Sequence, residues 1–129
     1  MQVMAGLFYE FHRYRVVSRA GQPIMVKENV EVGPIISREA AVRQLRNGKD
    51  VYTLQKRDAK ELAAQIYVTD PACETPHKPS HFQHFHPGGE HPRFPKGQEG
   101  RPRAETGPGH VFFGSRGENF NPEHPGEAC

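Results

Sequence analysis

Aromatic and β-branched residues alternate in part with polar ones over residues 7–17, a pattern typical of a β-strand with one buried face. Residues 24–32 show a similar alternation, with valine or isoleucine at several even positions. The segment Ala20-Gly21-Gln22-Pro23 between them consists of residues that favour turns. We therefore predict a β-hairpin over residues 1–32.

After Gly33-Pro34 the apolar residues recur at helical spacing instead. Ser37 stands at a position suited to an N-cap, and Asn47-Gly48 supplies residues that favour a helix C-terminus. A second stripe of the same spacing follows a short β-forming segment. These patterns predict a helix over residues 37–47, a strand over residues 50–54 and a second helix over residues 57–67.

The character of the chain changes at Asp70-Pro71. Residues 70–129 contain ten of the twelve prolines and nine of the thirteen glycines, which prevents long regular elements. Two islands of β-forming aromatic residues interrupt this part, at residues 81–86 and 110–113, and we predict a short strand at each. The polar segment from Gly88 to Gly109 is expected to be a flexible loop.

Together these elements predict a small α+β domain with a single core, which is what a chain of 129 residues sustains. The single domain, residues 1–129, has four expected parts. A hairpin over residues 1–32 is followed by a helix-strand-helix unit over 33–69, a histidine-bearing region over 70–114 and a flexible tail over 115–129. No apolar run approaches the roughly 18 residues of a membrane helix, and the N-terminus lacks the features of a signal peptide. Cys73 and Cys129 lack the spacing of a zinc ribbon or redox motif, and we expect free thiols.

Charge is distributed unevenly, although the formal net charge is only +2. Residues 1–69 carry eleven Lys or Arg residues against seven Asp or Glu, whereas residues 70–129 carry six against eight. The simpler interpretation of the basic half is a solvated surface. The alternative is a groove that follows a phosphate backbone.

Histidine is the residue type that points to chemistry. Seven of the eight histidines follow residue 70, and His84 and His86 alternate within the first aromatic island. A period of two places both rings on one face of a strand, and His110 begins the second island. Imidazoles on neighbouring strands form either a proton-transfer site or a metal site. Exposed loop positions are expected instead for three others, His77, His91 and His124.

Four short motifs occur in series along residues 33–114: Gly48-Lys49-Asp50-Val51-Tyr52-Thr53, Asp58-Ala59-Lys60-Glu61-Leu62-Ala63, His84-Phe85-His86-Pro87 and Gly109-His110-Val111-Phe112-Phe113-Gly114. This series resembles the C-terminal toxin domains of bacterial polymorphic toxins, of the Rhs/YD-repeat, LXG and haemagglutinin-like kinds. Those domains commonly show a valine-tyrosine-threonine strand, an aspartate-alanine helix, a histidine-aromatic-histidine-proline segment and a closing glycine-histidine-aromatic strand. Residues 1–32 lie outside the resemblance, and the loop after Gly88 is longer than the pattern suggests.

The resemblance implies an antibacterial effector, most often a nuclease, that a cognate immunity protein neutralises. Such a domain is secreted or delivered into a target cell as part of a larger effector, and it acts in the target cytoplasm. The resemblance also implies that His84, His86 and His110 form the catalytic site. We expect RNA as the substrate, a monomeric protein and no membrane partner.

The expected mechanism is that of a metal-independent ribonuclease, which needs no cofactor. One histidine takes the proton of a ribose 2′-hydroxyl, and another protonates the departing 5′-oxygen. Lys56, Arg57 and Arg116 are candidates for stabilising the charge of the transition state. Phe85 and Phe113 are candidates for stacking on unpaired bases.

Two alternatives remain open. The first is a metal-dependent DNase. The three histidines are also suited to a divalent metal such as zinc or magnesium, and His86 with Asn119 and His124 loosely resembles an HNH nuclease. A non-catalytic metal-binding or interaction protein is the second. A deaminase is disfavoured because paired zinc-binding cysteines are missing. We favour acid–base catalysis over metal binding because no carboxylate lies close to His84 and His86 in the sequence.

Overall fold

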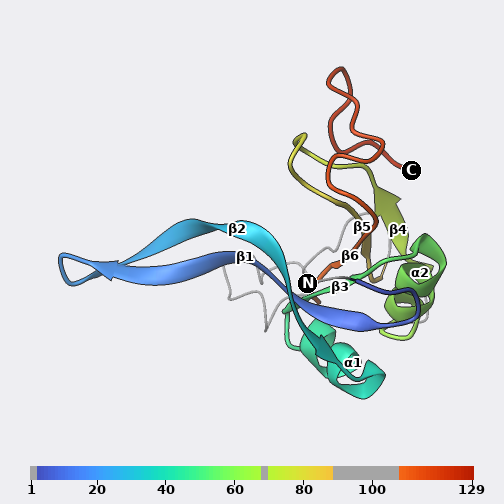
Figure 1. The fold of residues 1–129 in the computed structure, drawn as a ribbon, viewed down its shortest axis with the longest axis horizontal. Helices are drawn as coiled ribbons and strands as arrows, with labels where there is room; N and C mark the ends of the chain where they lie inside the picture. The colour runs from blue at the N-terminus through green and yellow to red at the C-terminus, as the bar shows by residue number, and fades with distance from the viewer. Residues whose placement is uncertain (1–2, 68–69, 89–107) are drawn as a thin grey trace.

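The computed structural model describes residues 3–67, 70–88 and 108–129, and Figure 1 shows how they are arranged. These ranges contain six strands and two helices. In chain order they are β1 (Phe8–Arg19), β2 (Gln22–Ile36), α1 (Arg38–Arg46), β3 (Asp50–Thr53), α2 (Lys56–Ala64), β4 (Ala72–Glu74), β5 (Gln83–His86) and β6 (Val111–Phe113).

All six strands belong to one mixed sheet, in the order β2-β1-β3-β6-β5-β4. The pair β3 and β6 is parallel, and the other pairs among the described strands are antiparallel. Because β6 lies between β3 and β5, the last strand of the chain joins the two halves of the sheet. Two helices beside one mixed sheet confirm the predicted α+β fold.

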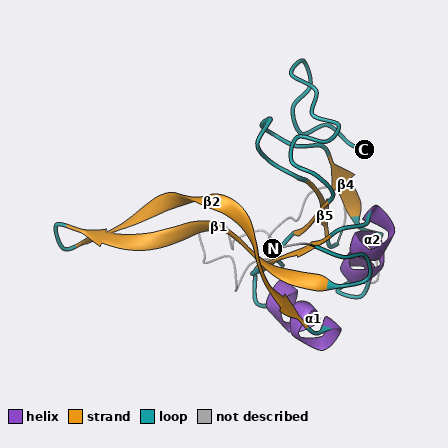
Figure 2. Ribbon diagram, viewed as in Figure 1, coloured by secondary structure: helices purple, strands orange, loops and turns teal. Residues whose placement is uncertain are grey.

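Both helices pack on the same face of the sheet, which we call the helix face (Figure 2). Small and aliphatic side chains of the helices meet inward-facing residues of four strands in one core, composed of Phe8, Ala41, Leu45, Val51, Ala59, Leu62, Ala63, Phe85, Val111 and Phe113. Removing this apolar surface from water is the main stabilising contribution to the fold. The predicted N-cap is confirmed, because Ser37 Oγ accepts a hydrogen bond of 3.1 Å from the backbone N–H of Ala40.

The opposite face of the sheet carries a second cluster, made of aromatic side chains, and we call it the aromatic face. Its buried members are Tyr9, Phe11, Tyr52, Phe82 and Phe112. Phe11 stacks on Phe112 with ring centroids 4.4 Å apart, and Tyr52 lies edge-on to Phe82 at 5.3 Å. The sheet is therefore buried on both faces in its central strands.

The predicted hairpin is formed by β1 and β2, and its outer part extends away from the rest of the molecule (Figure 1). The sequence predicted that Gly33-Pro34 would end the second strand, whereas β2 continues to Ile36. Tyr9 pairs with Ile35 and Phe11 pairs with Val32, so the register shifts between them and both Gly33 and Pro34 lie opposite Glu10. Since β2 is an edge strand, proline is tolerated there despite its missing N–H.

The two aromatic islands form β5 and β6, as predicted. The short strand β4 was not predicted, and the tail expected to be flexible is held against it. The backbone N–H of Thr75 donates to the carbonyl of Glu127 at 2.8 Å, and that of Cys129 donates to the carbonyl of Cys73 at 3.1 Å. Cys73 and Cys129 also form a disulfide bond, which corrects the expectation of free thiols.

Most of the predicted loop between Gly88 and Gly109 lies outside the described residues, and so does His91. Within the described ranges, no helix is both long and apolar enough to cross a membrane.

Candidate functional site

The pairing of β4, β5 and β6 brings the predicted histidines together with a carboxylate. Glu74 of β4 is the cross-strand partner of His84, and His84 is in turn the partner of Phe112. Ala72 is the partner of His86, which leaves only a small side chain beside that imidazole. Since Phe85 between the two histidines points into the core on the helix face, His84 and His86 point to the aromatic face.

His110 immediately precedes β6, and its backbone is fixed from both sides. Its N–H donates a hydrogen bond of 2.9 Å to Oδ1 of Asp50. Its carbonyl oxygen accepts a hydrogen bond of 3.1 Å from the N–H of Val51. These bonds to the start of β3 hold the imidazole of His110 beside that of His86.

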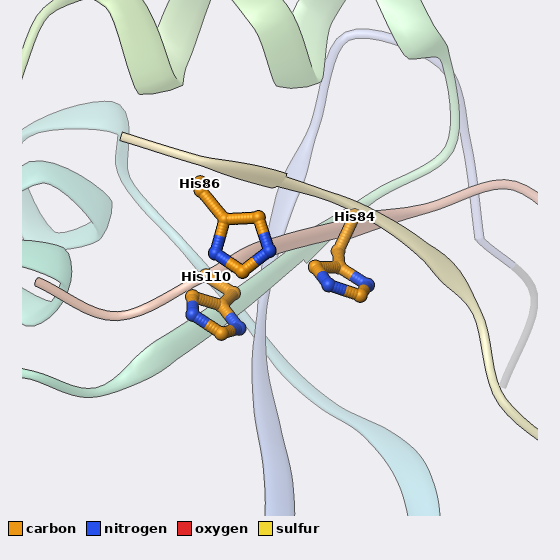
Figure 3. Close-up of side chains that lie close together, drawn as sticks. All are labelled: His84, His86 and His110. Atoms are coloured by element: carbon orange, nitrogen blue, oxygen red, sulfur yellow. The ribbon is translucent and has the colours of Figure 1, made fainter. Parts of the chain in front are cut away.

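The three imidazoles lie close together, as Figure 3 shows, and all three are buried. The ring centroids of His86 and His110 are 4.1 Å apart, those of His84 and His86 are 4.8 Å apart, and those of His84 and His110 are 5.2 Å apart. Their exposed fractions are 3% for His84, 6% for His86 and 7% for His110. We call these three residues the histidine cluster.

Glu74 supplies the carboxylate of the site, and no pattern in the sequence pointed to it. Its Oε2 atom lies 3.3 Å from Nε2 of His84 and 3.1 Å from Nε2 of His86. Burial alone raises the pKa of Glu74, but the hydrogen-bonding contacts and positive charges of His84 and His86 outweigh it and lower the pKa from 4.5 to about 2. Glu74 therefore carries its negative charge throughout the neutral range.

The second ring nitrogen of His84 faces another acceptor. Nδ1 lies 3.4 Å from the backbone carbonyl oxygen of Phe82, so its N–H donates a long hydrogen bond to that oxygen. In a neutral ring with this tautomer, Nε2 carries the lone pair, and it is Nε2 that faces Glu74. An oxygen and a nitrogen with facing lone pairs require a proton or a cation between them.

His77 lies in a loop and is exposed, as predicted, but it also belongs to the site. Its Nε2 lies 3.1 Å from Oε2 of Glu74, and its ring stacks on that of His84 with centroids 5.5 Å apart. Unlike the histidine cluster, the His77 side chain is 55% exposed. On its other side the ring lies so close to Gly126 that a Cβ atom there would overlap it, so the C-terminal tail helps to place His77.

The two phenylalanines predicted to stack on bases do not reach the site. Phe85 and Phe113 stack on each other in the core of the helix face, with ring centroids 5.3 Å apart, and both are 2% exposed. Strand alternation explains the correction, because a residue next to His84 and His86 in a strand points to the opposite face. Neither ring has a face free for a base.

The three predicted cations are exposed, but they lie at different places. Lys56 and Arg57 begin α2, which packs on the helix face and so lies across the sheet from the histidine cluster. The guanidinium carbon of Arg116 lies 5.1 Å from the ring centroid of Phe82, a member of the aromatic cluster. Of the three, Arg116 is the one that shares a face with the imidazoles.

The structure does not assemble the HNH-like arrangement. The side-chain amide of Asn119 donates a hydrogen bond of 3.1 Å to Gln83, whose position in β5 has the same parity as Phe85 of the helix face. His124 is exposed in a turn of the C-terminal tail. The partners that the structure gives His86 are instead Glu74 and the other two histidines of the cluster.

The arrangement is chemically suited to proton transfer and to metal binding. Each residue of the histidine cluster offers a ring nitrogen, and these atoms lie within 4.8 Å of one another; the same holds for a second group, Glu74, His77 and His84. Both groups share His84 and lie on the aromatic face. Comparison with protein-family models, curated proteins and solved structures gives no match to this chain.

Proposed function

We propose that this chain is a nuclease domain of the kind carried by bacterial polymorphic toxins, acting on RNA and neutralised by a cognate immunity protein. The observation that carries the proposal is the convergence of three buried imidazoles and an ionised carboxylate on one face of the sheet. The series of sequence motifs supports the same assignment, because two of the four motifs supply the histidines of the cluster.

Packing alone gives no reason for this cluster. The neighbouring positions on the aromatic face are filled by aromatic side chains, whose only polar groups, the hydroxyls of Tyr9 and Tyr52, each have a backbone partner. Three imidazoles and a carboxylate at equivalent positions lose hydration on burial, and each then requires a partner. Buried titratable groups that converge in this way are typical of sites that carry out chemistry.

Cleavage of a phosphodiester bond needs the groups that this site brings together. A base must take a proton from the attacking hydroxyl, and an acid must give one to the leaving oxygen, near neutral pH. Histidine serves both roles, and Glu74 fixes the orientation of two of the rings. His77, which contacts the same carboxylate, is exposed to solvent.

The structure changes the argument about mechanism. The sequence favoured metal-independent catalysis because no carboxylate stood near His84 and His86, but strand pairing brings Glu74 against both. A carboxylate beside imidazoles supports proton transfer and metal ligation equally well. The nuclease proposal therefore stands with either mechanism.

Purified protein incubated with total RNA, and separately with plasmid DNA, tests the proposal. We expect cleavage of RNA, and we expect His84→Gln and His110→Gln to reduce the rate by roughly 100-fold or more, as is usual when a proton-transferring or metal-binding histidine is lost. His124→Gln is the matched control, because His124 is exposed in the tail, and it should cleave at the wild-type rate.

Expression in bacteria without a co-expressed antidote gives a second readout. Wild-type protein should arrest growth, and His110→Gln should not. Cleavage of neither nucleic acid by folded wild-type protein, or equal rates for all three histidine variants, would rule out the assignment. Cleavage of DNA in preference to RNA would retain the nuclease and overturn the substrate.

A further inference from the structure

We infer that Glu74, His84, His86 and His110 bind one divalent transition-metal ion, with zinc as the first candidate. The inference deepens the proposed function, since it names the cofactor of the same site. It rests on the positions of the four side chains and on the ring nitrogens and carboxylate oxygen that they bring together.

The two distances from the Glu74 carboxylate to His84 and His86 are close to those between donor atoms around a four-coordinate metal. Zinc–nitrogen and zinc–oxygen bonds are about 2.0–2.2 Å long, so neighbouring donors of a tetrahedral site lie about 3.3–3.6 Å apart. Oε2 of Glu74 is 3.3 Å from Nε2 of His84 and 3.1 Å from Nε2 of His86. Each residue of the histidine cluster, His110 included, also offers a ring nitrogen, and these nitrogens lie within 4.8 Å of one another.

The hydrogen bond of His84 to the backbone prepares that ring for ligation. A metal-bound histidine usually donates its other ring N–H to a carbonyl or carboxylate, which fixes the tautomer. Nδ1 of His84 faces the carbonyl oxygen of Phe82, and Nε2 is left facing Glu74. A metal ion between Nε2 and the carboxylate resolves the opposition of their lone pairs.

The donor set also selects among metals. Three imidazoles and one carboxylate suit zinc and its neighbours in the first transition row, whereas magnesium and calcium prefer sites built from oxygen. We therefore expect no tight magnesium binding here. His77, which contacts Glu74 from the exposed side, is placed to orient the carboxylate rather than to ligate the ion.

Metal titration of the full chain tests the inference without any use of enzymatic activity. Protein stripped with a chelator and then dialysed is titrated with zinc chloride in a calorimeter, and with cobalt(II) chloride while its visible spectrum is recorded. We expect one equivalent of zinc, the intense visible bands of four-coordinate cobalt(II), and a higher midpoint of thermal unfolding in zinc. Magnesium chloride should produce no heat of binding and no shift.

Variants assign the ligands. Glu74→Gln, His84→Ala, His86→Ala and His110→Ala should each weaken zinc affinity by about 100-fold or more, and His77→Ala by about tenfold. His124→Ala and His12→Ala alter exposed histidines and should bind within about twofold of wild type. Glu74→Gln preserves size and shape, so it keeps the test decisive if an alanine variant fails to fold.

The outcomes separate this inference from the proposed function. Failure to bind zinc or cobalt, or binding that the Glu74 and His110 variants leave unchanged, overturns the metal site. RNA cleavage that continues in EDTA, in protein that binds no zinc, also overturns the metal site but retains the nuclease. One tight zinc ion on a protein that cleaves no nucleic acid retains the metal site and overturns the nuclease.

Discussion

Glu74 is the residue on which the electrostatics of the site depend. Its Oε2 atom contacts three imidazoles, those of His77, His84 and His86, at 3.1–3.3 Å. In metal-free protein it is the negative charge that these imidazoles face, and its pKa is lowered in the folded state. Its effect on stability should therefore depend on pH.

The free energy of unfolding of metal-free wild type should exceed that of Glu74→Gln by an amount that varies with pH. The pKa of Glu74 is lowered from 4.5 to about 2 in the folded state, so its contribution is fully present above about pH 4.5 and is lost as the pH falls toward 2. Urea denaturation of both proteins in EDTA, at intervals from pH 2.5 to 6, measures the difference. A difference that stays constant across this range would contradict the assignment of Glu74 as the ionised partner.

At the scale of single residues, the sequence predicted part of the site. His84, His86 and His110 could be selected because each stands beside β-forming aromatic residues in a part of the chain otherwise rich in proline and glycine. Glu74 and His77 could not be selected, since their role depends on the pairing of β4 with β5, which no local pattern encodes. Phe85 was assigned to the wrong face because stacking was inferred from residue type without strand alternation.

At the scale of elements, the site depends on how closely β6 approaches the turn before β3. The backbone N–H of Gly109 donates a hydrogen bond of 2.8 Å to the carbonyl of Leu45, and a Cβ atom on Gly109 would overlap the carbonyl of Lys49. The neighbouring atoms are backbone, which cannot rotate away as a side chain would. Glycine is therefore required next to His110.

Gly109→Ala should lower the free energy of unfolding by about 2–3 kcal/mol, as is typical of overpacking against rigid atoms, and should weaken zinc binding by moving His110. Gly21→Ala is the control: it has open space for a Cβ atom but a φ of +78°, so it should cost about 1 kcal/mol and leave zinc binding unchanged. Chemical denaturation and zinc titration of both variants provide the comparison. Equal effects of the two substitutions on zinc binding would contradict the steric role of Gly109.

Local patterns explain which elements were predicted. The helices were predictable because spacing and capping residues such as Ser37 act within a few residues of one another. The strands β5 and β6 were predictable from their aromatic content. The strand β4 and its pairing with the tail were not, because Ala72–Glu74 is short and its partners lie far away in the sequence.

Across the whole molecule, the two faces of the sheet have separate roles. The helix face buries the aliphatic core, and the aromatic face holds the imidazoles and Glu74. The C-terminal tail contacts the residues of the aromatic face, since it pairs with β4 at Glu74 and lies against the ring of His77. The disulfide bond between Cys73 and Cys129 therefore ties the end of the chain to the residue next to the carboxylate of the site.

Loss of that disulfide should reduce both stability and metal affinity. The two cysteines are 56 residues apart, and closing a loop of this length lowers the entropy of the unfolded chain. The unfolded state is raised in free energy as a result, which corresponds to about 4 kcal/mol of stability. We expect the double variant Cys73→Ser/Cys129→Ser to unfold at lower urea concentration by up to this amount. We also expect weaker zinc binding, because β4 loses the tail that holds Glu74 and His77 in place.

The measurement is urea denaturation and zinc titration of both proteins, each with and without a phosphine reductant, which lacks the zinc-binding thiols of dithiothreitol. The reductant should shift the wild type toward the behaviour of the double variant and should leave the double variant unchanged, which separates the disulfide from other effects of the reagent. If the reduced wild type and the double variant kept full stability but bound zinc less tightly, the tail would act on the site alone. If both kept full stability and full zinc affinity, the tail would have no part in holding Glu74, and β4 would owe its position to β5 and the core residue Phe85 instead.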